Sequence, residues 1–336
     1  MKTILLFILL LLPISSIIQS QTGKDKWETY FEKSGFLSTP DYNETIAYLK
    51  RLAQASPYAR LIKIGVSPQG RDLFCFIVSK DKSFIPAEAR KLNKPVIMIQ
   101  NGIHSGEIEG KDACLLLLRE ILITKEKSDW LDHVILLIVP VFNVDGHERT
   151  SPYNRINQNG PSNMGWRTTA QNLNLNRDYM KADAPEMRSF LKLYNSWLPD
   201  FFIDTHTTDG MDCQYSVTYA IEKNGNVPPG TETWIRNKYI PAIEKETAAA
   251  GFKILPYFDV RDHDLRKGLS DGVTTPMEPI AQKMADLNPS IKEEFMKKVE
   301  SDEKFRESPR QRLNFFYQRS PYYDSRLNIY PVMRVE

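Results

Sequence analysis

Two residues that could bind a metal ion follow a short apolar run. Residues 95–100 (PVIMIQ) are typical of a β-strand, and His104 and Glu107 come soon after them, three residues apart. Imidazole and carboxylate are both good zinc ligands, and this separation lets one loop bring both onto a single ion. Such a pair also occurs by chance, so its position at a predicted strand-to-helix junction is what favours a metal site.

A third candidate ligand, His206, follows a second predicted strand, residues 201–204. Binding residues of α/β sheets lie at the carboxyl ends of strands, so we expect His206 near His104 and Glu107. Two histidines and one glutamate leave a fourth zinc position open, which is the pattern of a catalytic rather than a structural site. Asp204 is a candidate to orient an imidazole.

A third group of candidates lies in and just after a long polar stretch, residues 150–174. A loop of this length in a compact domain is usually functional or disordered. Arg167 lies within it, and Asn176 and Arg177 follow it. A guanidinium suits a substrate carboxylate, and an arginine near a metal could also stabilise the oxyanion of a tetrahedral intermediate. Considered alone, each arginine is more typical of a polar surface loop.

The elements that must position these residues alternate between strands and helices. The predicted strands are residues 61–66, 73–78, 95–100, 134–139, 201–204 and a strand starting at 253–255, and the predicted helices are residues 109–123, 185–197 and 233–249. The first two strands flank a Pro-Gln-Gly turn and should form a hairpin. The predicted fold is therefore α/β, with a mixed, mostly parallel sheet and helices on both faces.

Three residues near these elements have simpler interpretations. Cys114 falls within the pattern of the helix at 109–123 and is expected in the core. His147 follows Asp145-Gly146 and is expected in a turn. Arg71 fits either the surface of the hairpin or the rim of the site.

Composition and charge exclude several classes of protein. The chain has 336 residues, of which 41% are hydrophobic and 26% charged, as in ordinary globular proteins and unlike disordered chains. The net charge of +2 argues against a nucleic-acid partner, which normally needs a marked basic excess. Three cysteines cannot build a disulfide framework.

The first twenty residues predict a secretory signal peptide. Lys2 precedes the apolar run 4–12, which ends at Pro13 before several serines. The alternative is a membrane anchor, but the run is shorter than the ~20 residues needed to span a bilayer. No later segment is long and apolar enough either. We therefore expect a secreted or periplasmic protein without a membrane span after removal of the signal.

The ordered set of candidate residues resembles the zinc carboxypeptidases of the carboxypeptidase A type. The matching positions are His104-Ser105-Gly106-Glu107, Arg167, Asn176-Arg177 and His206, and residues 141–146 (VFNVDG) also resemble the family's stretch after its central strand. The resemblance extends over residues 41–271. It implies that His104, Glu107 and His206 bind zinc and that Arg167 polarises the scissile carbonyl. Asn176 and Arg177 would hold the terminal carboxylate of a peptide or protein substrate.

One part of the family's pattern has no match. The family uses a glutamate on a late strand as general base, and no glutamate after His206 lies in an apolar, strand-like run. Asp259 lies in such a run but is not assigned this role. The resemblance implies that a segment with late strands is missing near Met277-Glu278. The candidates for the family's substrate-contacting tyrosine are Tyr215, Tyr219 and Tyr257.

The expected organisation is a signal peptide at 1–20, a zinc carboxypeptidase-like domain at 21–277 and a helical C-terminal appendage at 278–336. Three functions remain open. The first is an exported zinc carboxypeptidase, and the second is a non-catalytic zinc- and peptide-binding relative or a shortened gene product. The third is a zinc amidase or deacylase on the same scaffold. General-base assistance adds about 10²–10⁴-fold to a rate, so a chain without the base would turn over slowly.

Overall fold

The structure, a computed structural model, describes part of the chain. The described residues are 26–302, except for 157, 159, 209–216, 222–226, 253, 258, 261–268, 271–296 and 299. The predicted signal peptide and most of the predicted C-terminal appendage lie outside these ranges, so the domain boundaries stay predictions. The same holds for the deletion expected near Met277-Glu278. No helix of the described part is long and apolar enough to cross a membrane.

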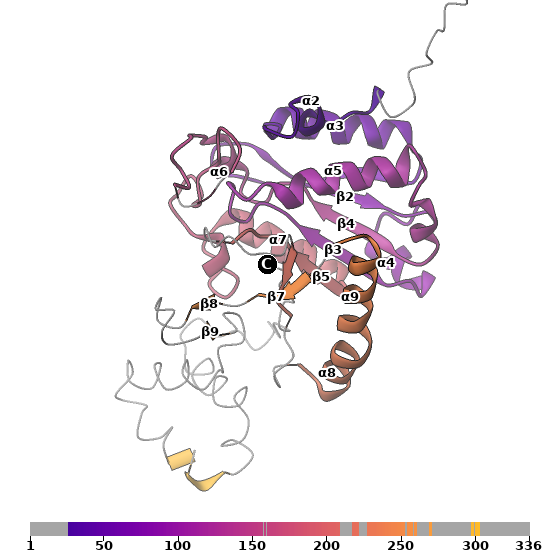
Figure 1. Cartoon of the computed structure of the whole chain (residues 1–336), viewed down its shortest axis with the longest axis vertical. Helices are drawn as coiled ribbons and strands as arrows, with labels where there is room; N and C mark the ends of the chain where they lie inside the picture. Colours follow the sequence, from indigo (N-terminus) through magenta and orange to yellow (C-terminus); the bar gives the residue numbers. More distant parts are fainter. Residues whose placement is uncertain are drawn as a thin grey trace, which may run out of the picture.

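A five-stranded sheet with the strand order β1-β2-β4-β3-β5 forms the centre of the fold (Figure 1). The strands are β1 (Ala59–Val66), β2 (Asp72–Val78), β3 (Val96–Gln100), β4 (Ile135–Val139) and β5 (Phe201–Asp204). β1 and β2 form the predicted hairpin, and β2 pairs antiparallel with β4. β3 pairs parallel with both β4 and β5, so these three strands end at the same edge of the sheet. The predicted mixed α/β sheet is confirmed.

Helices cover both faces of this sheet, as expected. Helices α3 (Tyr42–Ala55) and α5 (Glu109–Leu122) lie on one face and α7 (Pro185–Trp197) on the other (Figure 1). On the first face, Leu52 of α3 packs with strand residues in one buried apolar cluster. On the second face, Phe190 of α7 packs with other strand residues in a second buried apolar cluster. Burial of these apolar stripes is the main force that holds the layers together. Cys114 is buried in the first cluster, which confirms its core position.

Helix α3 was not among the predicted elements, although its first turn carries a sequence signal. The Asp41 side chain accepts a hydrogen bond from the Glu44 backbone N–H, and the Glu44 carboxylate accepts one from the Asp41 N–H. This reciprocal capping box satisfies two backbone donors at the start of the helix.

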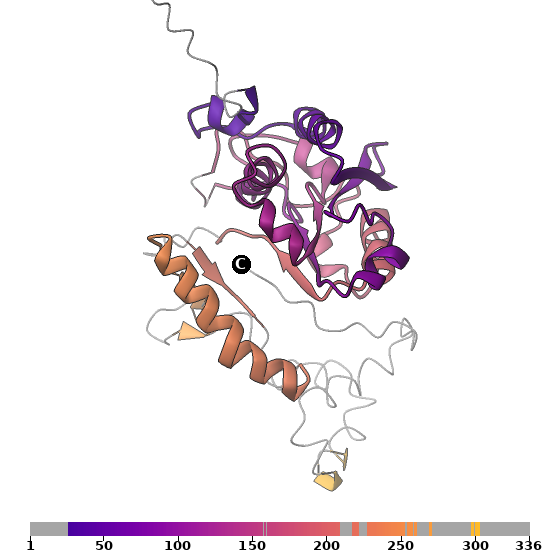
Figure 2. The same cartoon turned by 90° about the vertical axis from the view of Figure 1, so that its right-hand side faces the viewer.

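The C-terminal part of the described chain contains smaller elements. These are β6 (Val217–Tyr219), α8 (Pro229–Trp234), the π-helical turn η4 (Ile235–Tyr239), α9 (Ile240–Ala249), β7 (Ile254–Pro256), β8 (Asp259–Val260) and β9 (Leu269–Ser270). Helices α8 and α9 are joined by η4 into one continuous helix (Figure 2). This continuous helix begins at Pro229, earlier than residue 233, where the predicted helix begins. Proline suits the first helical position, because no backbone N–H is needed there.

Several short helices complete the described fold. They are α2 (Tyr30–Lys33), α4 (Pro86–Ala89), η1 (Arg90–Leu92), η2 (Ser128–Asp132), α6 (Val144–Glu148) and η3 (Leu175–Arg177). Asp145 in α6 accepts hydrogen bonds from Ser67 Oγ and the Gln69 N–H and forms an ion pair with Arg71. Arg71 therefore ties the hairpin turn to α6.

His147 is not a turn residue, which corrects the expectation from sequence. It lies in α6 with 4% of its surface exposed. Its Nδ1 is 2.8 Å from Glu148 Oε1, and its Nε2 is 3.1 Å from the Nζ of the buried Lys111 in α5. Burial lowers the pKa of His147 to about 4, and the charge of Lys111 adds to this effect. The folded protein therefore holds a neutral imidazole here.

This buried imidazole predicts an acid-sensitive part of the stability. The pKa of His147 is about 4 in the folded protein and about 6.5 in the unfolded chain. Its contribution is therefore complete above pH 6.5 and is lost as the pH falls towards 4. Between pH 7 and pH 5 the free energy of unfolding should fall by about 2 kcal/mol more in the wild type than in His147→Gln. Urea denaturation of both proteins measures this difference, and parallel stability curves would contradict it.

Candidate metal centre

The three expected metal ligands meet at the shared end of β3 and β5. The ligand atoms of His104, Glu107 and His206 all lie within 4.8 Å of one another. His104 Nδ1 is 2.8 Å from Glu107 Oε1, and His206 Nδ1 is 2.8 Å from Glu107 Oε2. We call these three residues the metal cluster. In the described part of the chain, no other group of three His, Cys, Asp or Glu side chains comes this close together.

The parallel pairing of β3 with β5 produces this meeting. Gln100 and Asp204 are the last paired residues of the two strands, and the ligands follow within a few positions. On one side, a turn in which the Glu107 N–H donates to the His104 carbonyl places both side chains together. On the other side, the Thr205 N–H donates to the Gln100 carbonyl and continues the strand pairing almost to His206.

Asp204 orients His206 in the way expected from its position. Its Oδ2 lies 2.9 Å from His206 Nε2, and its Oδ1 accepts a hydrogen bond from Gln100 Nε2 at 2.9 Å. Gln100 Nε2 also donates to the Tyr179 hydroxyl at 2.9 Å. Because Asp204 engages Nε2, the other ring nitrogen of His206 is the one directed at Glu107 and available for a metal.

Charges within the buried cluster shift its pKa values in opposite directions. Burial alone would raise the pKa of Glu107, but hydrogen bonds with His104 and His206 hold it well below its usual range. Burial opposes the charge on His206, yet Asp204 and Glu107 raise its pKa to about 9. Burial lowers the pKa of His104; Glu107 opposes this shift, and the charges of His206 and Arg167 add to it. Without a metal, the cluster therefore presents an ionised carboxylate between a neutral His104 and a protonated His206, which would release its proton on binding a metal.

The donor set of the cluster fits zinc. Two imidazole nitrogens and one carboxylate oxygen are the ligands of one common type of catalytic zinc site. The side chains are almost fully enclosed, with 4%, 2% and 2% of their surfaces exposed for His104, Glu107 and His206. An ionised carboxylate in so enclosed a position is costly unless cations or hydrogen-bond donors surround it, as they do here.

Replacing Asp204 by asparagine should weaken zinc binding by about 10- to 100-fold. The amide carries no charge, so it holds the Nε2–H of His206 less firmly. The Nδ1 of the imidazole then becomes a weaker ligand for the metal. Competition with a chromophoric chelator measures the zinc Kd. Asp200→Asn is a matched control, because Asp200 accepts from the Val96 N–H at the opposite end of β5. An unchanged zinc Kd in Asp204→Asn would contradict the assigned role.

Of the other predicted site residues, two lie beside the cluster. Arg167 is half-buried and close enough for its charge to act on His104. Asn176 Nδ2 is 3.2 Å from His104 Nε2. When Nδ1 binds a metal, Nε2 carries a hydrogen, so the Asn176 amide would then turn its oxygen towards it. Arg177 is exposed and donates to the Asn176 carbonyl.

Two residues at the site were not found from the sequence. Arg155 is only 6% exposed, and its Nη2 lies 2.8 Å from Glu107 Oε1. Gln158 accepts a hydrogen bond from Arg155 Nε and donates to Thr207 Oγ1 at 3.1 Å. Both lie in the polar stretch at 150–174, whose length was expected to indicate a functional or a disordered segment. Its length was a signal, but nothing in its composition marked these two positions.

The family's general base has no counterpart in the described ranges. Glu232 pairs with Arg236, Glu244 accepts from Tyr219, Glu246 pairs with its neighbour Lys245, and Glu300 is exposed. None of these contacts involves the metal cluster. The glutamates that follow His206 but lie outside the described residues are Glu222, Glu278, Glu293, Glu294, Glu303, Glu307 and Glu336.

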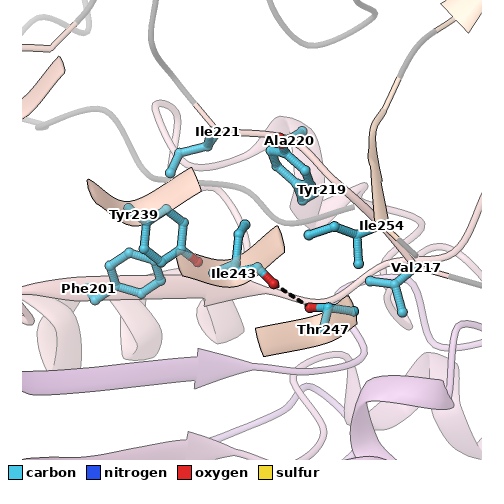
Figure 3. A pocket seen from close by; sticks show the side chains of 9 residues that line it. All are labelled: Phe201, Val217, Tyr219, Ala220, Ile221, Tyr239, Ile243, Thr247 and Ile254. Atoms are coloured by element: carbon cyan, nitrogen blue, oxygen red, sulfur yellow. Dashed lines mark hydrogen bonds between the residues drawn. The ribbon is translucent and has the colours of Figure 1, made fainter. Parts of the chain in front are cut away.

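An apolar cavity of about 130 Å³ lies between β6, β7 and α9, and it contains no residue of the metal cluster (Figure 3). Its lining residues are Phe201, Val217, Tyr219, Ala220, Ile221, Tyr239, Ile243, Thr247 and Ile254. Of the three candidate tyrosines, Tyr219 lines this cavity and donates to Glu244 Oε1 at 3.2 Å. Tyr257 follows β7, and its N–H donates to the Tyr219 carbonyl. Tyr215 lies outside the described residues.

Comparisons with known proteins identify the family of the chain. A family model described as zinc carboxypeptidase matches residues 45–251, more than half of the chain. Carboxypeptidase A6 of Mus musculus is 30% identical over 114 residues, which cover 32% of this chain and 24% of the relative.

Solved structures of metallo-carboxypeptidases are also similar. The enzyme from Burkholderia cenocepacia has a TM-score of 0.49 at 19% identity, with 64% of this chain and 52% of that chain covered. The enzyme from Pseudomonas aeruginosa has a TM-score of 0.47 at 21% identity, with 64% and 50% covered. The chain thus spans about half of each of these two structures and about a quarter of the Mus musculus relative. On the family match, the chain belongs to the zinc carboxypeptidase family.

Proposed function

We propose that this protein is an exported zinc-dependent metallocarboxypeptidase that hydrolyses the C-terminal peptide bond of a peptide or protein. The observation that carries the proposal is the metal cluster, in which His104, Glu107 and His206 bring their ligand atoms within 4.8 Å. A bound zinc ion supplies Lewis acidity towards the scissile carbonyl and towards water. Family membership supports zinc as the metal.

In this proposal the residues around the cluster bind and orient the substrate. Arg167, beside His104, places a positive charge where the carbonyl oxygen of the scissile bond gains negative charge. Arg177 is exposed and free of burial constraints, so its guanidinium can receive the terminal carboxylate together with the Asn176 amide. Asp204 keeps His206 oriented through the reaction.

A second candidate function is a non-catalytic zinc- and peptide-binding relative. The described glutamates after His206 favour it, because Glu232, Glu244 and Glu246 bond to residues away from the metal cluster and Glu300 is exposed. Without a general base, the rate should be lower by about 10²–10⁴-fold. Such a protein would still bind zinc and a peptide carboxylate.

We further propose that the protein is secreted or periplasmic. Support comes from the basic, apolar and serine-rich succession in residues 1–20. The proposed partner is a peptide or protein with a free C-terminal carboxylate, and neither nucleic acid nor a membrane span after signal removal is part of the proposal. Detection of the mature chain in the periplasmic or extracellular fraction tests the location.

Release of C-terminal amino acids from short peptides tests the activity. Purified, zinc-loaded protein is incubated with a peptide panel, and mass spectrometry follows the products with and without a chelator. The matched control is the same panel with amidated C-termini, which a carboxypeptidase should not cleave because the carboxylate is absent. Chelator-sensitive release from free peptides alone supports the proposal. Cleavage of blocked peptides or acylated substrates would indicate an amidase, and no release would leave the binding relative.

A further inference from the structure

A ring of contacts joins the loop around Arg155 to Glu107 and to the segment that follows His206. Arg155 Nη2 lies 2.8 Å from Glu107 Oε1, and Arg155 Nε donates to Gln158 Oε1. Gln158 Nε2 donates to Thr207 Oγ1 at 3.1 Å and to the Thr208 carbonyl. The ring closes because the Thr207 N–H donates to Glu107 Oε2 at 3.2 Å. Glu107 is thus held through both oxygens.

Gly106 makes room for this arrangement. A Cβ at this position would lie 2.5 Å from Arg155 Cδ and 3.0 Å from the Gly165 carbonyl oxygen. Both distances are too short for carbon in van der Waals contact. The arginine stem therefore occupies the volume that a side chain at position 106 would otherwise fill. The absence of a side chain at Gly106 thus allows a buried guanidinium to reach the carboxylate.

The ends of the loop are themselves fixed. Ser151 and Met164 form an isolated antiparallel bridge, with backbone hydrogen bonds of 3.0 and 3.1 Å in the two directions. The Trp166 N–H then donates to the Gly146 carbonyl at 2.7 Å. Arg155 lies between these anchored ends, so backbone hydrogen bonds hold its loop in addition to the contact with Glu107.

We propose that Arg155 is a positioning residue that fixes the carboxylate of Glu107 for metal binding, with Gln158 coupling it to the segment that carries His206. The inference rests on the proposed zinc site and adds a residue to its surroundings. The forked guanidinium contacts Glu107 through Nη2 and Gln158 through Nε, and the single nitrogen of an ammonium group lacks this fixed spread of donors. Glu107 is therefore held in one orientation before a metal arrives.

The same guanidinium also brings a positive charge close to the metal position, which by itself would weaken the binding of a cation. The two effects have opposite signs for the zinc Kd when Arg155 is removed. Contacts that orient metal ligands are worth about 10- to 100-fold in metal affinity. We expect orientation to dominate, because the guanidinium is hydrogen-bonded to the carboxylate and both are buried.

Zinc binding by the full-length mature chain tests the proposal. The zinc Kd is measured by competition with a chromophoric chelator for the wild type, Arg155→Met and Arg155→Lys, and the melting temperature of each metal-free protein reports folding. We expect a 10- to 100-fold weaker Kd in Arg155→Met and a loss of the same order in Arg155→Lys, which keeps the charge without the fork. Arg149→Met is the matched control, because Arg149 lies in the same region over the Trp166 ring and should leave the Kd unchanged.

The outcomes separate this inference from the proposed function. If the wild type binds no zinc, the proposed metal site itself fails. If the wild type binds zinc and Arg155→Met binds it equally or more tightly, the positioning role is wrong. Gly106→Ala provides a second test if Arg155→Met does not fold, because its methyl group displaces the arginine stem and should weaken zinc binding in the same direction. An unchanged zinc Kd in folded Gly106→Ala would also overturn the proposal.

Discussion

Replacing His206 by alanine should weaken zinc binding by about 100-fold or more and abolish chelator-sensitive peptide hydrolysis. The free energy of zinc binding to structural sites with four ligands is roughly 10–16 kcal/mol, or about 3 kcal/mol for each ligand. A change of about 1.4 kcal/mol in this free energy changes the Kd tenfold. The loss also leaves Asp204 without its imidazole partner, in a position that is 1% exposed. Chelator competition measures the Kd, and peptide release measures the activity.

His133→Ala is the matched control for this change. His133 follows η2 and is exposed, and it has no contact with the metal cluster. Its removal should change neither the zinc Kd nor the rate. The melting temperature of metal-free His206→Ala shows whether the sheet is intact, and His206→Gln is the fallback if it is not. Wild-type zinc affinity in a folded variant would remove His206 from the proposed centre.

Replacing Arg167 by methionine should reduce kcat by about 10²–10³-fold while leaving the zinc Kd nearly unchanged. Loss of one group that stabilises a developing oxyanion typically has this effect. Methionine keeps much of the length and apolar volume of the arginine stem, so the loop should keep its position. The rate is measured with the peptide that the wild type cleaves best, and kcat and KM are determined separately.

The separation of kcat from KM decides between two roles for Arg167. A fall in kcat with a similar KM indicates stabilisation of the transition state, whereas a raised KM alone indicates uniform substrate binding. Arg149→Met again serves as the control, because it removes a guanidinium at the residue directly after α6 without touching the cluster. A variant at position 167 with wild-type kcat would contradict the proposed role.

Much of the fold could be predicted because it follows from local patterns of apolar and polar residues in the sequence. The central strand β4 has five buried residues in a row, as its apolar sequence indicated. Helix α7 and strand β5 have the predicted bounds. By contrast, β6 is three residues long and shows no clear alternation, and its pairing with β7 depends on residues distant in the chain. A short strand of this kind is specified by tertiary contacts rather than by its own sequence.

The metal cluster could be predicted because its members follow recognisable strands, whereas its surroundings could not. His104, Glu107 and His206 are residue types that bind zinc, and each comes soon after a predicted strand of the same sheet. Arg155 is an arginine in a polar loop, where an exposed position is the usual expectation. Its burial against Glu107 depends on the anchored ends of the loop and on the missing side chain at Gly106. Neither condition is visible as a pattern in the sequence.

The parallel pairing of β3 with β5 also has a consequence for the order of events during folding. His104 and Glu107 are close in the chain, but His206 joins them only when two strands separated by about a hundred residues have paired. Contacts of such long sequence separation carry a high loop-closure entropy and form slowly. A chain caught before this pairing holds two of the three ligands and should bind zinc weakly. Excess zinc should then slow global unfolding far more than it speeds the earliest steps of folding, because it stabilises a contact that forms late.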